Sequence, residues 1–166
     1  PEGNSSYLPI WVDYNENNMN TVNENSKMCV VDLELNIEVT HPCTRQVELY
    51  LYGPGPNTYD ATLQPHGRDH HVKLFGGRDG TQHGCGENLK GTTFNDSLLS
   101  SPLSECCKSP WTGKFMPEEP LESFKGVEAN GEWKLRIHDN VADGRSGAVD
   151  SWNIAFQLEP CRPRYT

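Results

Sequence analysis

CVVDLELNIEV, at residues 29–39, alternates apolar and polar side chains along its whole length. The apolar positions are Cys29, Val31, Leu33, Leu35, Ile37 and Val39. Because successive side chains of a β-strand point to opposite faces, this period of two predicts a strand with one buried and one solvated face.

Four shorter segments show the same alternation, at residues 47–52, 72–75, 133–137 and 152–158. Glycine and proline at residues 53–56 end the first of them, since proline cannot donate to a strand ladder and glycine accepts turn geometry. Only residues 118–124 hint at a helical turn, and the remainder of residues 76–126 is expected to form loops. Strands separated by turns, without an amphipathic helix, predict an all-β sandwich.

The length of 166 residues suits one domain with short extensions. Residues 1–28 are polar and rich in asparagine, so we interpret them as a leader or linker. The sandwich is assigned to residues 29–161, and residues 162–166 are interpreted as a C-terminal tail.

Six cysteines predict three disulfides, an oxidising compartment and disulfide-anchored loops. They are Cys29, Cys43, Cys85, Cys106, Cys107 and Cys161. The adjacent Cys106 and Cys107 are expected to bond to different partners. The sequence does not choose among the fifteen pairings, but Cys29 and Cys161 flank the first and last strong strands, which favours a bond between them. No CxxC pair is present, so zinc is the weaker interpretation.

Two N-glycosylation triplets begin at Asn4 and Asn95 and agree with a secreted, extracellular protein. No apolar run long enough to insert into a membrane is seen. The formal net charge of −9, without a basic stripe, argues against nucleic acid and leaves protein as the expected partner.

A series of motifs in the second half carries a family resemblance. It comprises GTTFND at 91–96, WTGKFMP at 111–117, NGEWKL at 130–135, then Asp139, Gly147 and DSW at 150–152. This order resembles the P domain (P/Homo B domain) of kexin-like and subtilisin-like proprotein convertases. His41 and the segment around residues 49–54 agree more loosely, so the resemblance spans about residues 29–158. It implies a jelly-roll-like antiparallel sandwich that stabilises a neighbouring protease and tunes its calcium and pH dependence.

Acidic loop residues give candidate calcium ligands, because hard cations need several converging oxygens. The candidates are Asp96, Asp139, Asp143 and Asp150, with Asn140 and Glu128 as helpers. By resemblance, Asp96 and Asp139 occupy the best-defined acidic positions of the family. Gln46 stands where the family usually has an aspartate, which weakens the calcium prediction. The competing interpretation is that these carboxylates cap turns.

Catalysis is not expected from this chain, because no serine lies in a nucleophile elbow or a subtilase-type motif. The histidines at 66, 70, 71 and 83 admit a metal site or a pH switch, with plain solvation as the simpler interpretation. Trp111 and Phe115 admit a binding patch or packing beneath the cysteine-rich loop.

Two functions remain open. The first is a non-catalytic accessory P domain that stabilises or regulates an adjacent secreted subtilisin/kexin-like serine protease. The second is a stand-alone structural or adhesive module of an extracellular protein assembly, favoured by the extra cysteines and the glycosylation triplets.

Overall fold

A computed structural model describes residues 5–13, 27–54, 70–76, 87–97, 111–139 and 147–161. These residues form eight β-strands and two short 3-10 helices. The strands are β1 Ser5–Val12, β2 Met28–Thr40, β3 Val47–Tyr52, β4 His71–Phe75, β5 Leu89–Phe94, β6 Trp111–Phe115, β7 Gly131–Asp139 and β8 Ala148–Pro160. The 3-10 helices are Thr44–Gln46 and Leu121–Phe124.

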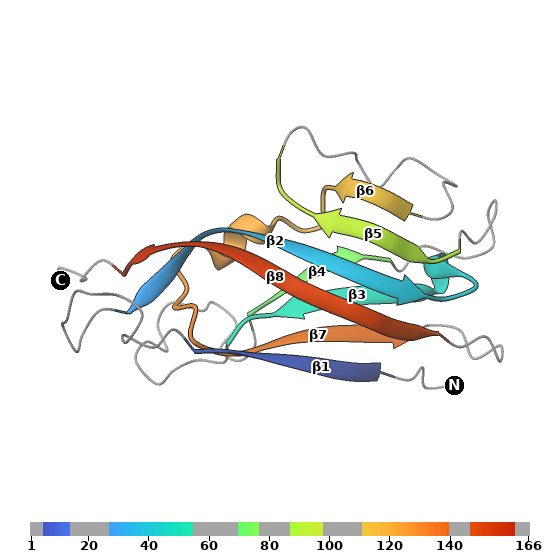
Figure 1. Cartoon of the computed structure of the whole chain (residues 1–166), viewed down its shortest axis with the longest axis horizontal. Coiled ribbons are helices and arrows are strands. Elements are labelled where there is room, and N and C mark those ends of the chain that lie inside the picture. Colours follow the sequence, from blue (N-terminus) through green and yellow to red (C-terminus); the bar gives the residue numbers. More distant parts are fainter. Residues whose placement is uncertain are drawn as a thin grey trace.

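The strands build two four-stranded sheets that pack face to face (Figure 1). The first sheet has the order β1-β7-β3-β4 and the second the order β6-β5-β2-β8. Neighbouring strands are antiparallel except β5 and β6, which run parallel. The all-β sandwich predicted from the alternating segments is therefore confirmed.

The core lies between the inner faces of the two sheets. Trp133 of β7 is fully buried, and its ring lies against Phe124 and Phe156 at centroid distances of 5.2 and 5.0 Å. Its indole Nε1 donates a hydrogen bond to the Ala129 carbonyl at 2.9 Å, which satisfies the one polar atom of the side chain. Trp152, on the apolar phase of β8, packs against this core but is only partly buried.

The inward phase of β2 differs from the sequence prediction at its start. Val30 is buried, whereas Val31 is only half-buried. The pairing of β2 with β8 shifts register between Val30 and Asp32. A β-bulge inserts an extra residue and so reverses which residues face inward on one side of it. From Leu33 to Val39 the expected alternation holds.

The predicted bond between Cys29 and Cys161 is present, with their Cα atoms 4.9 Å apart. Strands β2 and β8 lie side by side along nearly their whole length (Figure 1). Their antiparallel register places Cys29, near the start of β2, beside the end of β8, which Cys161 follows. Cys43 is disulfide-bonded as well. Cys85, Cys106 and Cys107 lie outside the described residues.

Three strands lie in parts of the chain that were expected to be irregular. Ser5–Val12, within the region interpreted as a leader, pairs with β7 as the edge strand of the first sheet. Leu8 and Val12 pack against the core from this strand, and an edge position accommodates Pro9. Leu89–Phe94 and Trp111–Phe115, within the predicted loop region, pair with each other in the second sheet. The expected helical turn is confirmed at Leu121–Phe124.

Candidate functional site

A buried histidine joins the two sheets where β2 ends. His41 follows β2 of the second sheet, and its imidazole Nε2 lies 3.0 Å from the carboxylate of Asp139, the last residue of β7 in the first sheet. Its Nδ1 accepts a hydrogen bond from the Cys43 backbone N–H at 2.9 Å. Because Nδ1 accepts, the proton of the neutral ring is on Nε2 and is donated to Asp139. Only 2% of the His41 side chain is exposed, so its ring is shielded from water, whereas 23% of the Asp139 side chain is exposed.

The chain packs closely around His41. A Cβ atom on Gly147 would lie 2.3 Å from the Thr40 carbonyl oxygen and 2.6 Å from Cδ2 of His41, so only glycine fits there. On the other side, the side-chain oxygen of Asn88 accepts the His41 backbone N–H at 2.9 Å, and the Asn88 N–H donates to the His41 carbonyl at 3.0 Å. Asn88 has a φ of 62°, a left-handed conformation that asparagine tolerates better than most residues.

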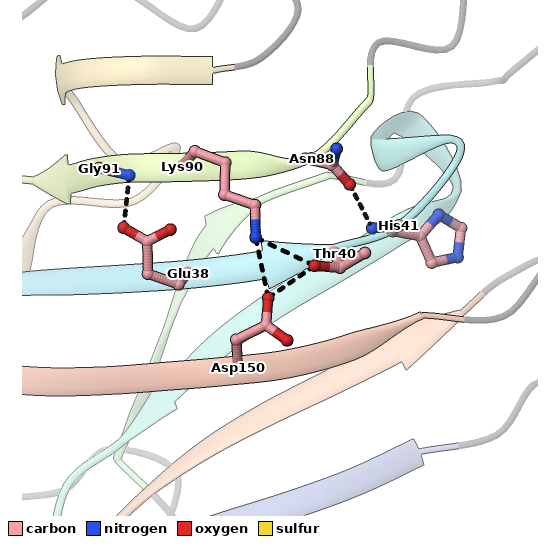
Figure 2. Close-up of polar contacts among 7 residues, drawn as sticks. All are labelled: Glu38, Thr40, His41, Asn88, Lys90, Gly91 and Asp150. Atoms are coloured by element: carbon pink, nitrogen blue, oxygen red, sulfur yellow. Dashed lines mark hydrogen bonds and ion pairs between the residues drawn. The ribbon is translucent and has the colours of Figure 1, made fainter.

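A second polar cluster connects β2, β5 and β8 on the outer face of the second sheet (Figure 2). The Thr40 hydroxyl donates to Asp150 Oδ2 at 2.6 Å. The Lys90 ammonium donates to the Thr40 oxygen and to the same Asp150 oxygen, both at 3.0 Å. The hydrogen bond from Thr40, followed by that from Lys90, lowers the pKa of Asp150. The carboxylate of Asp150 is therefore paired with a positively charged side chain of the same domain.

Asp96 caps a turn. One of its carboxylate oxygens accepts the backbone N–H of Leu121 at 2.9 Å and the other accepts that of Glu122 at 2.7 Å. These N–H groups open the 3-10 helix Leu121–Phe124 and have no partner within it. This contact matches the turn-capping interpretation of the acidic residues.

The candidate calcium ligands thus each have a protein partner where they are described. Asp96 bonds to backbone N–H groups, Asp139 to His41, and Asp150 to Thr40 and Lys90. Asp143 lies outside the described residues, as does Asn140. Within the described ranges, no group of three or more histidine, cysteine or acidic side chains is placed to hold a metal ion. Calcium binding stays a prediction.

The other residues singled out from the sequence fall at separate places. The amide nitrogen of Asn95 donates to Glu34 at 3.0 Å, and its amide oxygen accepts the Ser97 N–H at 2.6 Å. Gln46 is buried, and Glu128 forms an ion pair with Lys27 at 3.7 Å. Asn4, His66 and His83 lie outside the described residues.

The two described histidines of the candidate metal group make ring contacts. His70 stacks on Phe124 and lies 3.2 Å from the Ser123 hydroxyl, and burial, followed by the neighbouring His71, lowers the pKa of His70. His71 stacks on Tyr52.

Trp111 and Phe115 belong to the core, with 4% of each exposed. The Trp111 indole donates to the Thr44 hydroxyl at 3.2 Å, and its ring lies 5.5 Å from that of Phe75. Packing is the correct interpretation of these two aromatic residues, and a binding patch formed by them is excluded by their burial.

The polar contacts of the three residues are structural: His41 joins the two sheets, Asp96 caps a 3-10 helix, and Asp150 joins neighbouring strands. Asp139 is the last residue of β7, Gly147 directly precedes β8, and Asp150 lies on β8. Residues 107–156 match the family model of the proprotein convertase P-domain. This match confirms the resemblance read from the second half of the chain. The segment matched covers β6, β7 and most of β8.

No curated protein and no solved structure gives a significant match to the chain. P domains of proprotein convertases are non-catalytic accessory domains of secretory-pathway proteins. In the part of the chain that the structure describes, no helix is both long and apolar enough to span a bilayer.

Sequence reasoning missed two features of this region. It named Asp139 as a metal ligand and His41 as a family position, but it did not pair them across the two sheets. It also missed Lys90, which neutralises Asp150. The register of β2 with β5 and β8 brings Lys90 to Asp150, and the packing of one sheet on the other brings His41 to Asp139. Both depend on long-range contacts that a single sequence does not specify.

Proposed function

We propose that this chain is the non-catalytic P domain that accompanies a secreted subtilisin/kexin-like serine protease, which it stabilises or regulates. The observation that carries the proposal is the family match over residues 107–156. The disulfide between Cys29 and Cys161 supports a secretory route, because such bonds persist in oxidising compartments.

The polar residues of the candidate site make structural hydrogen bonds, which supports a non-catalytic, accessory role. His41, Asp139, Asp96 and Asp150 are engaged in hydrogen bonds that join strands and cap a turn. A catalytic group needs an open approach for substrate and a partner that it can exchange protons with. His41 is closed off by Asn88, Gly147 and the Cys43 backbone, so its chemistry is structural.

The test is the full-length open reading frame that encodes this chain. We expect it to encode a subtilisin-like domain with an Asp/His/Ser triad on the N-terminal side of this sequence. A reading frame without any protease domain would contradict the proposal and favour the stand-alone structural or adhesive module.

A further inference from the structure

The outer face of the first sheet presents aromatic and cationic side chains in rows set by the strand register. Tyr7 of β1 pairs with Arg136 of β7, Arg136 with Tyr50 of β3, and Tyr50 with Lys73 of β4. In the next row, Pro9 pairs with Lys134, Lys134 with Tyr52, and Tyr52 with His71. Together with Ser5 and Trp11 of β1, these residues are termed the aromatic platform.

The edge of the aromatic platform is unusually exposed. Trp11 is 72% and Tyr7 52% exposed, and they are the two exposed large hydrophobic side chains of the described part of the chain. Both lie on the same side of β1, four residues apart, which is about 14 Å along a strand. Exposed apolar groups clustered on one face commonly mark a binding surface.

Arg136 lies between two tyrosine rings at the centre of the aromatic platform. Its guanidinium carbon is 5.9 Å from the Tyr7 ring centroid and 5.3 Å from that of Tyr50. One Nη donates to the Ser5 hydroxyl at 3.2 Å, and the Nε is buried without a hydrogen-bond partner. Burial, followed by the nearby Glu48, raises the pKa of Tyr50 to about 12, so this ring stays a neutral phenol beside Arg136.

The positive charge of Arg136 has no carboxylate partner among the described residues, unlike the charges of the two neighbouring lysines. Lys73 pairs with Glu118 at 3.3 Å, and Lys134 with Glu132 at 3.5 Å. Among the described residues, no carboxylate lies within ion-pair distance of Arg136. Although the chain as a whole carries a net charge of −9, the guanidinium of Arg136 is locally complementary to a single anionic group of a ligand.

The composition of the aromatic platform favours a sugar as its ligand over the surface of another protein. It alternates rings with hydrogen-bonding groups, and apart from Pro9 it has no aliphatic side chain. The buried centre of a protein interface is usually more apolar and poorer in charge than this. Aromatic faces stack on the C–H faces of pyranose rings, and a guanidinium binds a carboxylate through two parallel hydrogen bonds.

We propose that the aromatic platform binds an acidic oligosaccharide that contains uronate residues. Trp11 and Tyr7 stack on sugar rings, and Arg136 takes a uronate carboxylate. The distance between Trp11 and Tyr7 requires a ligand of several sugar units. This activity is separate from the accessory role, and neither depends on the other.

The test is binding of hyaluronan oligosaccharides to the full chain, measured by calorimetry and by the change in tryptophan fluorescence. A chito-oligosaccharide of equal length is the neutral control, since it shares the N-acetylglucosamine and lacks the uronate. We expect the neutral sugar to bind about tenfold more weakly, because it lacks the charge-assisted hydrogen bonds to Arg136. Equal binding of both sugars, or binding of neither, would overturn the proposal.

Two substitutions that each remove one positive charge test where the sugar binds. Arg136→Gln is expected to weaken hyaluronan binding about tenfold. Lys114→Gln removes an exposed cation from the second sheet and is expected to leave binding unchanged. An equal loss in both variants would show diffuse electrostatic attraction and contradict the assignment.

The thermal melting of each variant separates loss of the sugar site from loss of the fold. Trp11→Ala changes a second, exposed position of the aromatic platform, and binding of hyaluronan is expected to fall several-fold with little change in melting temperature. If the chain bound heparin and did not bind hyaluronan, the site would recognise sulfate groups rather than uronate carboxylates, and the proposed ligand would be wrong.

Discussion

His41 makes three contacts that hold the end of the sandwich together. Its ring bonds to Asp139 and to the Cys43 backbone, and its main chain bonds to Asn88. These partners come from β7, from the segment leading to Thr44–Gln46, and from the start of β5. One side chain therefore fixes the relative position of the two sheets and of a disulfide-bonded cysteine.

We expect His41→Ala to lower the free energy of unfolding by about 2–4 kcal/mol, since it leaves Asp139 and the Cys43 N–H without this partner and opens a cavity. Chemical denaturation of the oxidised protein measures this loss. His71→Ala, an exposed histidine, is the matched control and is expected to cost less than about 1 kcal/mol. A loss no larger than that of the control would contradict the role given to His41.

The contacts of Asp150 predict a pH dependence. Hydrogen bonds from Thr40 and Lys90 lower its pKa in the folded state, so the ionised form contributes stability above the unfolded-state pKa of about 4. This contribution is lost as the pH falls through the lower, folded-state value. The melting-temperature difference between the wild type and Asp150→Asn is therefore expected to shrink below about pH 4. A difference that is constant from neutral pH to about pH 2 would count against the contact.

At the scale of single residues, the acidic positions could be singled out from the sequence, but most of their partners in the fold could not. Calcium binding at Asp96, Asp139 and Asp150 stays a prediction. The structure gives these three carboxylates a turn cap, a histidine partner and a lysine partner in turn, and the turn cap at Asp96 was the alternative that the sequence offered. The partner of each carboxylate lies 25 or more positions away in the chain, so no local pattern reveals it.

Strand β2 is held at both ends, by the disulfide at Cys29 and by the polar contacts at Thr40 and His41. The disulfide closes a loop with a sequence separation of 132 residues. In the chain-entropy model, a loop of this size restricts the unfolded state by about 5 kcal/mol, with measured values for native disulfides of about 2–5 kcal/mol.

Replacing both Cys29 and Cys161 by serine is expected to lower the free energy of unfolding by about 2–5 kcal/mol. The same denaturation experiment measures it, with mass spectrometry to confirm that the other cysteines remain oxidised. The long ladder between β2 and β8 should keep the fold recognisable, so the circular dichroism of the native state is expected to change little. An unchanged stability would show that pairing of the two strands alone suffices.

At the scale of elements, the strands with uninterrupted alternation were predicted, and those interrupted by proline or glycine were not. β2, β3, β4, β7 and β8 lie where the alternation placed them. β1 was missed although Leu8, Ile10 and Val12 alternate with exposed residues, because Pro9 interrupts the run and polar residues surround it. β5 and β6 contain Gly91 and Gly113, both with positive φ, which disguise a strand in the sequence.

At the scale of the molecule, the fold class and the resemblance to the P domain followed from the sequence, but the interaction surfaces did not. The aromatic platform combines residues of four strands from distant parts of the chain. Tyr50 and Tyr52 alternate with the buried leucines of β3 and so face outward. The contact of Tyr52 with Tyr7 depends on β1 joining the first sheet, and that of Tyr50 with Arg136 on the pairing of β3 with β7.

The accessory role is tested most directly by removing this domain from the full-length protein and measuring the thermal stability of the remaining protease. We expect the truncated protease to melt several degrees lower, or to fail to accumulate in folded form, because a docked domain stabilises its partner through the shared interface. Adding the separate domain should restore part of the loss. A truncated protease with the same melting temperature and activity as the full-length protein would contradict the accessory role.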